Sequence, residues 1–166
     1  MVTYYTVFVI ELHSRRGYLV GSTPHPDEAF VLQIGRHLTD GTDGVLDGER
    51  FLICDRDRKW SRAVRHLLET SGVRVIRTPF RAPNGNAHAE RFVRSLNEEC
   101  LYRVIPLGER HVRRTLAEFV VHDHRERNYQ GLGNELIDGV GDQHPGGSVR
   151  RRQRVGGLLS YDYRAA

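Results

Sequence analysis

The chain has 166 residues, a hydrophobic content of 39% and a formal net charge of +4. This length and hydrophobic content are typical of one folded domain with a core, and they exclude a chain dominated by disorder. The longest apolar runs are too short to cross a bilayer and the N-terminus lacks the layout of a secretory signal, so we expect a cytoplasmic protein without a membrane partner. Cys54 and Cys100 lie in separate predicted elements, which favours free buried thiols over a disulfide scaffold or a cysteine zinc site.

The beginning of the chain predicts two strands and a helix. Residues 3–12 alternate in hydrophobicity and are rich in β-branched and aromatic side chains, and residues 17–22 can pair with them as a hairpin. After a break at two prolines, residues 27–38 have acids in the first turn and an apolar stripe at helical spacing, which predicts a helix. Residues 41–48 contain interleaved glycines and aspartates and predict a solvated loop.

A strand, a helix and a second strand are predicted next. The apolar run at residues 51–55 predicts a buried strand, residues 60–70 have apolar side chains at helical spacing, and residues 73–76 predict a short strand. Residues 77–86 contain prolines, a glycine and asparagines, and predict a mobile loop. This order indicates an α/β fold in which helices pack on a sheet.

The second half of the chain predicts two helices and a basic tail. The helices are expected at residues 87–102 and 109–122, and the first has a predicted packing stripe of Val93, Leu96 and Cys100. The chain then becomes polar and glycine-rich. We therefore divide it into a core, residues 1–140, and a basic Gly/Arg-rich C-terminal tail, residues 141–166, which is either a solvated tail or a non-specific DNA contact.

Two carboxylates stand where metal chemistry is expected. Asp55 ends an apolar strand, the position at which an α/β sheet opens onto a ligand crevice, and Glu90 stands early on a predicted helix. Carboxylate oxygens suit Mg²⁺ or Mn²⁺. Two alternatives remain: Asp57 shares a strand face with Asp55, and Glu90 can pair with Arg94 one helical turn later as an ordinary surface acid.

Three motifs resemble the integrase core of bacterial insertion-sequence transposases. They are ICDRD at residues 53–57, NGNAHAERF at residues 84–92 and HRERNYQGL at residues 124–132. In addition, TVFVIELHSRR at residues 6–16 is similar to that core's second strand and the turn after it. The resemblance implies a ribonuclease H-like mixed sheet flanked by helices, and an Asp-Asp-Glu triad that binds two Mg²⁺ or Mn²⁺ ions for DNA integration and transposition, with Asp55 and Glu90 as catalytic and metal-binding residues.

The chain departs from this family at its start. The family's first catalytic Asp stands on a central strand that precedes the segment matched by residues 3–12, and no residue of this chain matches it. We therefore expect a sheet without its first, central strand and strands on either side without a hydrogen-bonding neighbour. Glu11 falls where the family has a strand-end acid that binds no metal. We expect little or no strand transfer from this chain alone.

The basic residues predict contacts with DNA. All but one of the 25 basic side chains are arginines, Lys59 being the exception, and a genome rich in arginine codons is the main expected cause of that bias. Clustering is more specific, because basic residues gather around the two carboxylates and in the tail. The predicted DNA contacts are Arg56, Arg58, Lys59, Arg77, Arg81, Arg91, Arg94, Arg150, Arg151 and Arg152.

The resemblance implies element ends and target DNA as partners, with a second copy or an intact transposase, in the bacterial nucleoid. Two other functions stay open at this point: a non-catalytic DNA-binding remnant that regulates an intact transposase, and a ribonuclease H-like nuclease of DNA repair. His111, His122 and His124 lack a firm ligand spacing, which favours structural or exposed histidines over a zinc site.

Overall fold

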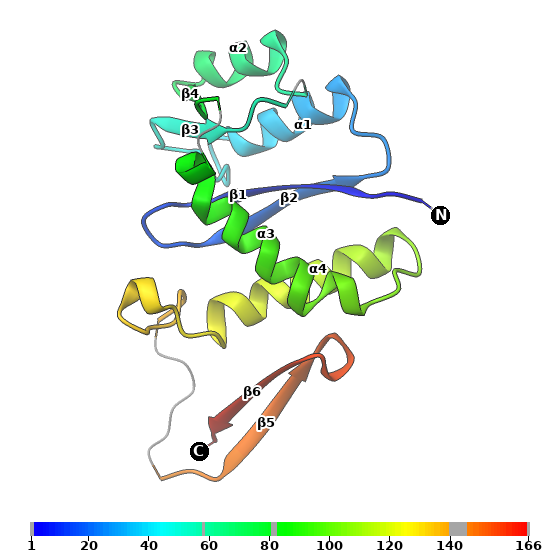
Figure 1. The fold of residues 1–166 in the computed structure, drawn as a ribbon. Coiled ribbons are helices and arrows are strands. Elements are labelled where there is room, and N and C mark those ends of the chain that lie inside the picture. Colours follow the sequence, from blue (N-terminus) through cyan, green and yellow to red (C-terminus); the bar gives the residue numbers. More distant parts are fainter. Residues whose placement is uncertain (1, 58, 81–82, 140–145, 166) are drawn as a thin grey trace. The chain divides into compact units, whose positions relative to one another are not determined.

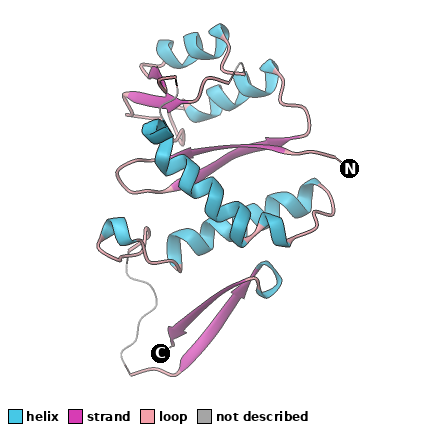
Figure 2. Cartoon of the chain, viewed as in Figure 1, coloured by secondary structure: helices cyan, strands magenta, loops and turns pink. Residues whose placement is uncertain are grey.

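The chain is a mixed α/β protein in a computed structural model that describes residues 2–57, 59–80, 83–139 and 146–165 (Figure 1). The strands are β1 (Tyr5–Ile10), β2 (Gly17–Thr23), β3 (Phe51–Cys54), β4 (Arg74–Arg77), β5 (Val149–Arg154) and β6 (Leu159–Arg164). The helices are α1 (Glu28–Leu38), α2 (Arg62–Thr70), α3 (Ala87–Glu99) and α4 (Glu109–Arg125), with short 3₁₀ turns η1 (Pro83–Asn86), η2 (Leu101–Arg103), η3 (Gln130–Leu132) and η4 (Val155–Gly157). Figure 2 shows their distribution along the chain. Among the described residues, no helix is long and apolar enough to span a membrane.

The chain forms two compact units. The first comprises Met1–Val9 and Val20–Glu90, and the second comprises Ile10–Leu19 and Arg91–Ala166. The boundary thus falls inside the β1–β2 hairpin and inside α3. This division differs from the expected core and tail, because the C-terminal residues belong to the same unit as α4.

The helices of the first unit begin at side chains that cap them. Asp27 accepts a hydrogen bond from the Phe30 backbone N–H at 2.8 Å, and Ser61 accepts one from the Val64 N–H at 3.3 Å. Such caps satisfy backbone donors that have no partner within the helix. The predicted helices at residues 27–38 and 60–70 are therefore confirmed, with first turns at Glu28 and Arg62.

The core of the first unit lies between the parallel β3–β4 pair and the helices α1 and α2. In that pair Leu52 lies opposite Val75, and the predicted strand, helix, strand order is confirmed. The buried cluster comprises Val31, Ile34, Leu38, Leu46, Leu52, Val64, Leu68 and Val73. These side chains include residues of both helices and Leu52 of β3, the strand that directly precedes Asp55. The position of Asp55 therefore depends on this core.

We predict that Leu68→Ala destabilises the protein by about 2–5 kcal/mol, because Leu68 is 0% exposed and its removal leaves a cavity. Leu107→Ala is the matched control, since Leu107 is 81% exposed and its truncation is expected to cost about 0.5 kcal/mol or less. The measurement is the free energy of unfolding in urea. Equal losses in the two variants would contradict the assigned core.

Strand pairing confirms the α/β class and leaves the sheet divided. Among the described residues, β1–β2, β3–β4 and β5–β6 are three separate two-stranded sheets. A parallel pair is normally covered on both faces, yet here Phe51, Ile53 and Ile76 are exposed on one face of β3–β4. One face of the β3–β4 pair is thus open, while the other carries the core side chains Leu52 and Cys54.

The second unit packs α3 and α4 around two aromatic rings. Phe92 and Phe119 meet edge to face, with ring centroids 5.8 Å apart. Gly17 lies against the same ring, since a Cβ there would come within 2.8 Å of Cε2 of Phe92. The predicted packing stripe of α3 was incomplete, because Phe92 is buried with Leu96 while Val93 is only half-buried.

Two of the predicted helix ends change in this unit. The helix α3 ends at Glu99 instead of continuing to residue 102, because the chain continues from Cys100 into the 3₁₀ turn η2. The helix α4 runs on to Arg125, beyond the predicted end at residue 122. Both cysteines are free and buried, as predicted.

The C-terminal residues form an antiparallel hairpin, β5–β6, where the sequence predicted no strand. The turn at η4 uses left-handed backbone at Gly156 and Gly157, with φ of 64° and 96°. The strand β5 reads VRRRQR, in which Val149 is the one apolar residue. A strand with so few apolar residues gives no alternating hydrophobic pattern, which is why the hairpin was not predicted.

Candidate functional site

Asp55 directly follows β3 and is held by its own loop. Its Oδ1 atom accepts hydrogen bonds from the Trp60 indole Nε1 and from the Asp57 backbone N–H, both at 3.1 Å. The residue is exposed. The two bonds fix the orientation of the carboxylate while it remains open to solvent.

Asp57, the alternative ligand, is engaged by Lys59. Its Oδ1 accepts the Lys59 backbone N–H at 2.9 Å, and its Oδ2 lies 3.1 Å from the Lys59 Nζ. The backbone hydrogen bond is the main reason that the pKa of Asp57 is lowered, and the ammonium group adds to the shift. Because both oxygens already have donors, Asp55 is the better placed of the two acids to bind a metal.

Thr78 connects the end of β3 with the start of α3. Its backbone N–H donates to the Cys54 carbonyl at 3.0 Å, and its own carbonyl accepts from Arg56 Nε at 2.9 Å. Gly85, just before α3, packs against the same residue, since a Cβ at Gly85 would lie 3.4 Å from the Thr78 Cβ. Asp55 and the beginning of α3 therefore lie at the same edge of the parallel pair.

Glu90 stands in the first turn of α3 and is exposed. It does not border the buried face of the helix, which was the expectation from the packing stripe, because the stripe centres on Phe92. Within the described parts of the chain, no group of three or more His, Cys, Asp or Glu side chains could hold a metal ion. The donor chemistry of Asp55 and Glu90 suits Mg²⁺ or Mn²⁺, but the described residues supply no third ligand.

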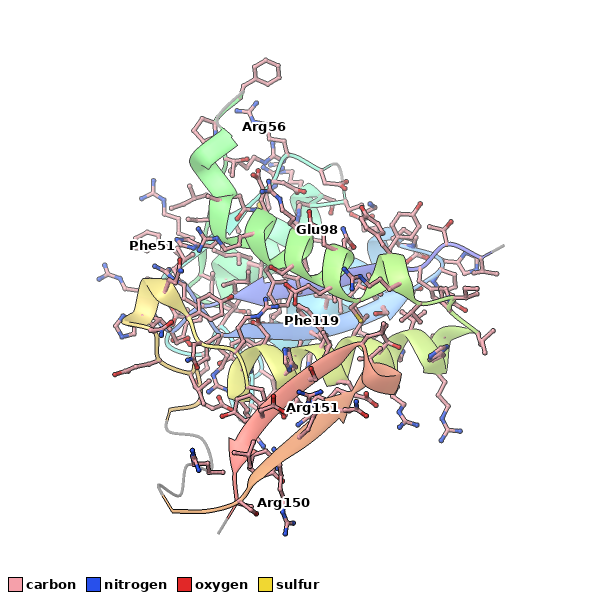
Figure 3. The ribbon with its side chains drawn as sticks, turned by 60° about the horizontal axis from the view of Figure 1, so that its bottom comes forward. Phe51, Arg56, Glu98, Phe119, Arg150 and Arg151 are labelled. Atoms are coloured by element: carbon pink, nitrogen blue, oxygen red, sulfur yellow. The ribbon has the colours of Figure 1, made fainter. Side chains whose placement is uncertain are left out.

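The basic residues of the first unit have structural contacts of their own. The guanidinium of Arg56 lies 5.9 Å from the Phe80 ring centroid, in addition to its bond to Thr78, and Lys59 lies 5.0 Å from the Tyr5 ring centroid. Figure 3 shows Arg56 beside the start of α3. Arg77 is exposed at the end of β4. The predicted contacts Arg58 and Arg81 lie outside the described residues.

The predicted DNA contacts of the second unit fall into two groups. Arg91 and Arg94 are exposed on α3. The hairpin arginines differ among themselves: Arg151 makes two hydrogen bonds to Asp162 at 2.8 and 3.0 Å, and Arg152 lies 3.5 Å from Glu126. Among the described residues, Arg150 has no ion pair and is exposed. Of the three, Arg150 is thus the most available to a phosphate.

Glu126 is a buried carboxylate that sequence analysis did not single out. Its side chain is 1% exposed, and Arg154 Nε lies 3.0 Å from each of its oxygens. His122 Nδ1 adds a contact at 2.9 Å. Burial would raise the pKa of Glu126, but the hydrogen bonds and charges of Arg154 and His122 outweigh it, so the pKa is lowered. The ion pair ties β5 to α4, and no sequence pattern links residues so far apart.

We predict that Glu126→Gln costs about 1.5–3 kcal/mol of unfolding free energy, because it removes the charged hydrogen-bond partner of the half-buried Arg154. Asp162→Asn, which removes the exposed partner of Arg151, is the control and should have a far smaller effect. Urea unfolding gives the first quantity, and amide hydrogen exchange should show faster exchange in β5 and β6 of the Glu126 variant alone. Unchanged exchange in that hairpin would contradict its attachment through Glu126.

His124 has a structural role that requires its neutral form. Its Nε2 accepts the Gly17 backbone N–H at 3.1 Å, and a protonated imidazole could not accept that bond. Burial is the main cause of its lowered pKa, with Arg16 and Arg125 adding to the shift and Asp138 opposing it. This contact gives His124 a structural role.

We predict that His124 lowers the stability of the protein as the pH falls below the ordinary histidine pKa of 6.5, while Asp123, whose pKa burial raises to about 6, acts in the opposite direction. The folded state keeps His124 neutral, so the unfolded chain takes up the proton first and the loss continues until the lowered folded pKa is reached. His124→Gln should flatten this part of the profile, whereas His66→Gln, at an exposed position on α2, should not. Unfolding free energies between pH 7.5 and about pH 5 test this, and parallel curves for the native protein and His124→Gln would contradict it.

Comparison with known proteins adds no further assignment. No protein-family model matches the chain, and neither does any curated protein sequence. The candidate site is therefore defined by its own residues. Its two acids are Asp55, which directly follows β3, and Glu90, in the first turn of α3.

Proposed function

We propose that this chain carries part of a transposase- or integrase-type site for DNA strand cleavage and strand transfer, with Asp55 and Glu90 as two of its metal-binding carboxylates. The observation that carries the proposal is the shared contact with Thr78, which joins the end of β3 to the start of α3. A strand end and a helix start at one sheet edge are where an α/β fold places its ligands. Three motifs resembling insertion-sequence transposases add support, and they indicate a cytoplasmic protein of the nucleoid.

The divided sheet also supports the proposal. A ribonuclease H-like sheet without its central strand would leave two separate strand pairs, and β1–β2 and β3–β4 are separate. Element ends and target DNA are the substrates that the resemblance implies, and a second copy or an intact transposase is the implied protein partner.

The chemistry assigns different tasks to the two acids. Divalent ions, when bound, would lower the cost of in-line attack on a phosphodiester by water and then by a DNA 3′-hydroxyl. Asp55 would hold them from the end of β3, oriented by Trp60 Nε1. Glu90 would bind one ion from α3, and Arg77, exposed at the end of the neighbouring strand, would neutralise a substrate phosphate.

We predict that the purified chain binds Mn²⁺ weakly and shows little or no strand transfer on a DNA end, because two carboxylates hold the ions less firmly than three. Asp55→Asn and Glu90→Gln should each reduce Mn²⁺ binding, measured by electron paramagnetic resonance. Asp57→Asn is the matched control, since Asp57 is paired with Lys59. Equal Mn²⁺ binding in all variants would exclude the proposed site, and vigorous metal-dependent strand transfer would contradict the expected inactivity.

A non-catalytic DNA-binding protein that regulates an intact transposase is the second candidate. The exposed Arg91, Arg94 and Arg150 favour it, because none of them needs a metal to bind a phosphate. Salt-sensitive DNA binding that survives Asp55→Asn and Glu90→Gln would support this function. A ribonuclease H-like repair nuclease is a third candidate, and cutting without joining would distinguish it.

A further inference from the structure

One face of the β5–β6 hairpin combines arginine and tyrosine side chains. In the strand register Arg150 lies opposite Tyr163, and Arg152 lies opposite Tyr161. Since residues two apart in a strand share a face, these four side chains lie on one side of the hairpin. We call this set, Arg150, Arg152, Tyr161 and Tyr163, the Arg–Tyr face.

The two rings of this face are stacked side by side, and a guanidinium lies against one of them. Tyr161 and Tyr163 are nearly parallel, with an interplanar angle of 4° and ring centroids 6.2 Å apart. The guanidinium of Arg152 lies 4.8 Å from the Tyr163 ring centroid. Both tyrosines are partly exposed. Flat aromatic and guanidinium groups are the surfaces on which unpaired bases stack.

The opposite face of the hairpin differs in charge. There Arg151 lies opposite Asp162 and is neutralised by it, and Gln153 lies opposite Ser160. On the Arg–Tyr face Arg152 lies 3.5 Å from Glu126, so Arg150 is the charge by which an anionic ligand would distinguish the two faces. The two faces also provide a matched pair of arginines, Arg150 and Arg151, next to each other in one strand.

The turn end of the hairpin is fixed by two carboxylates, and at the open end Arg150 has no ion pair with any residue that the structure describes. Arg154 binds Glu126, and the Val155 N–H donates to Glu118 at 2.6 Å. Figure 3 shows Arg150 at the other end of the hairpin. The hairpin is thus held in place by Glu118 of α4 and by Glu126, which directly follows that helix. Arg150 remains open to a phosphate.

We infer that the Arg–Tyr face binds single-stranded nucleic acid. Arg150 contacts the phosphates, and Tyr161 and Tyr163 stack with the bases, which only an unpaired strand can present. Binding of this kind needs neither a metal ion nor a particular base sequence. Because it uses neither Asp55 nor Glu90, the inference goes beyond the proposed strand-transfer site and stands or fails separately from it.

The test is fluorescence anisotropy of labelled oligo-dT, oligo-U and a mixed-sequence duplex with the full chain in EDTA. Tyr161→Ala combined with Tyr163→Ala should weaken binding of the single strands about tenfold or more, with little change for the duplex. Replacing the same two tyrosines by Phe keeps the rings and should retain affinity. The oligo-dT and oligo-U arms show whether DNA or RNA is preferred.

The matched arginine pair distinguishes binding at the Arg–Tyr face from general attraction between a basic protein and nucleic acid. Arg150→Gln and Arg151→Gln each remove one positive charge, and only Arg150→Gln should weaken oligo-dT binding. Equal effects of the two arginine variants, or full affinity in the double Tyr→Ala variant, would overturn the inference. Loss of affinity in the double Tyr→Phe variant would also overturn it, because stacking needs the ring and not the hydroxyl.

Discussion

The ion pair between Glu126 and Arg154 is the interaction on which the second unit depends. A carboxylate with 1% exposure is costly to bury unless its oxygens are bonded, and here Arg154 and His122 both contact them. The same residue lies near the end of α4, so it attaches the C-terminal hairpin to the helix. A nearby arginine, Arg127, contacts Asp123 and Glu99 and thereby joins α4 to the end of α3. In this unit polar contacts therefore add to the apolar packing around Phe92 and Phe119.

Sequence analysis predicted the elements whose signals are local. The helices α1 and α2 followed from apolar side chains at helical spacing, with acids in the first turn of α1, and β3 followed from its apolar run. The hairpin β5–β6 could not be predicted this way, because β5 is mostly arginine and is held by Glu126 from a distant part of the chain. The contact of Gly17 with Phe92 is equally non-local.

The candidate site shows the same division between local and distant information. Sequence placed Asp55 at a strand end and Glu90 early on a helix, and the structure has both in these positions. It could not reveal that Lys59 forms an ion pair with Asp57. Nor could it reveal that Thr78 is hydrogen-bonded to Cys54, the residue before Asp55. These contacts depend on loop geometry, which side-chain periodicity does not encode. They decide which acid is open to a ligand.

The charge of β5 has a consequence for how copies of the chain meet in solution. An unpaired strand edge is a template for pairing with another molecule, and dense like charge is one of the devices that prevents it. The arginines of β5 therefore keep hairpins of different copies apart. The β3–β4 pair is less protected, because Phe51, Ile53 and Ile76 are exposed on one of its faces and its charge is limited to Arg74 and Arg77 of β4. Self-association of this protein should begin at β3–β4, and raising the salt concentration, which screens the arginines, would add the hairpin as a second point of contact.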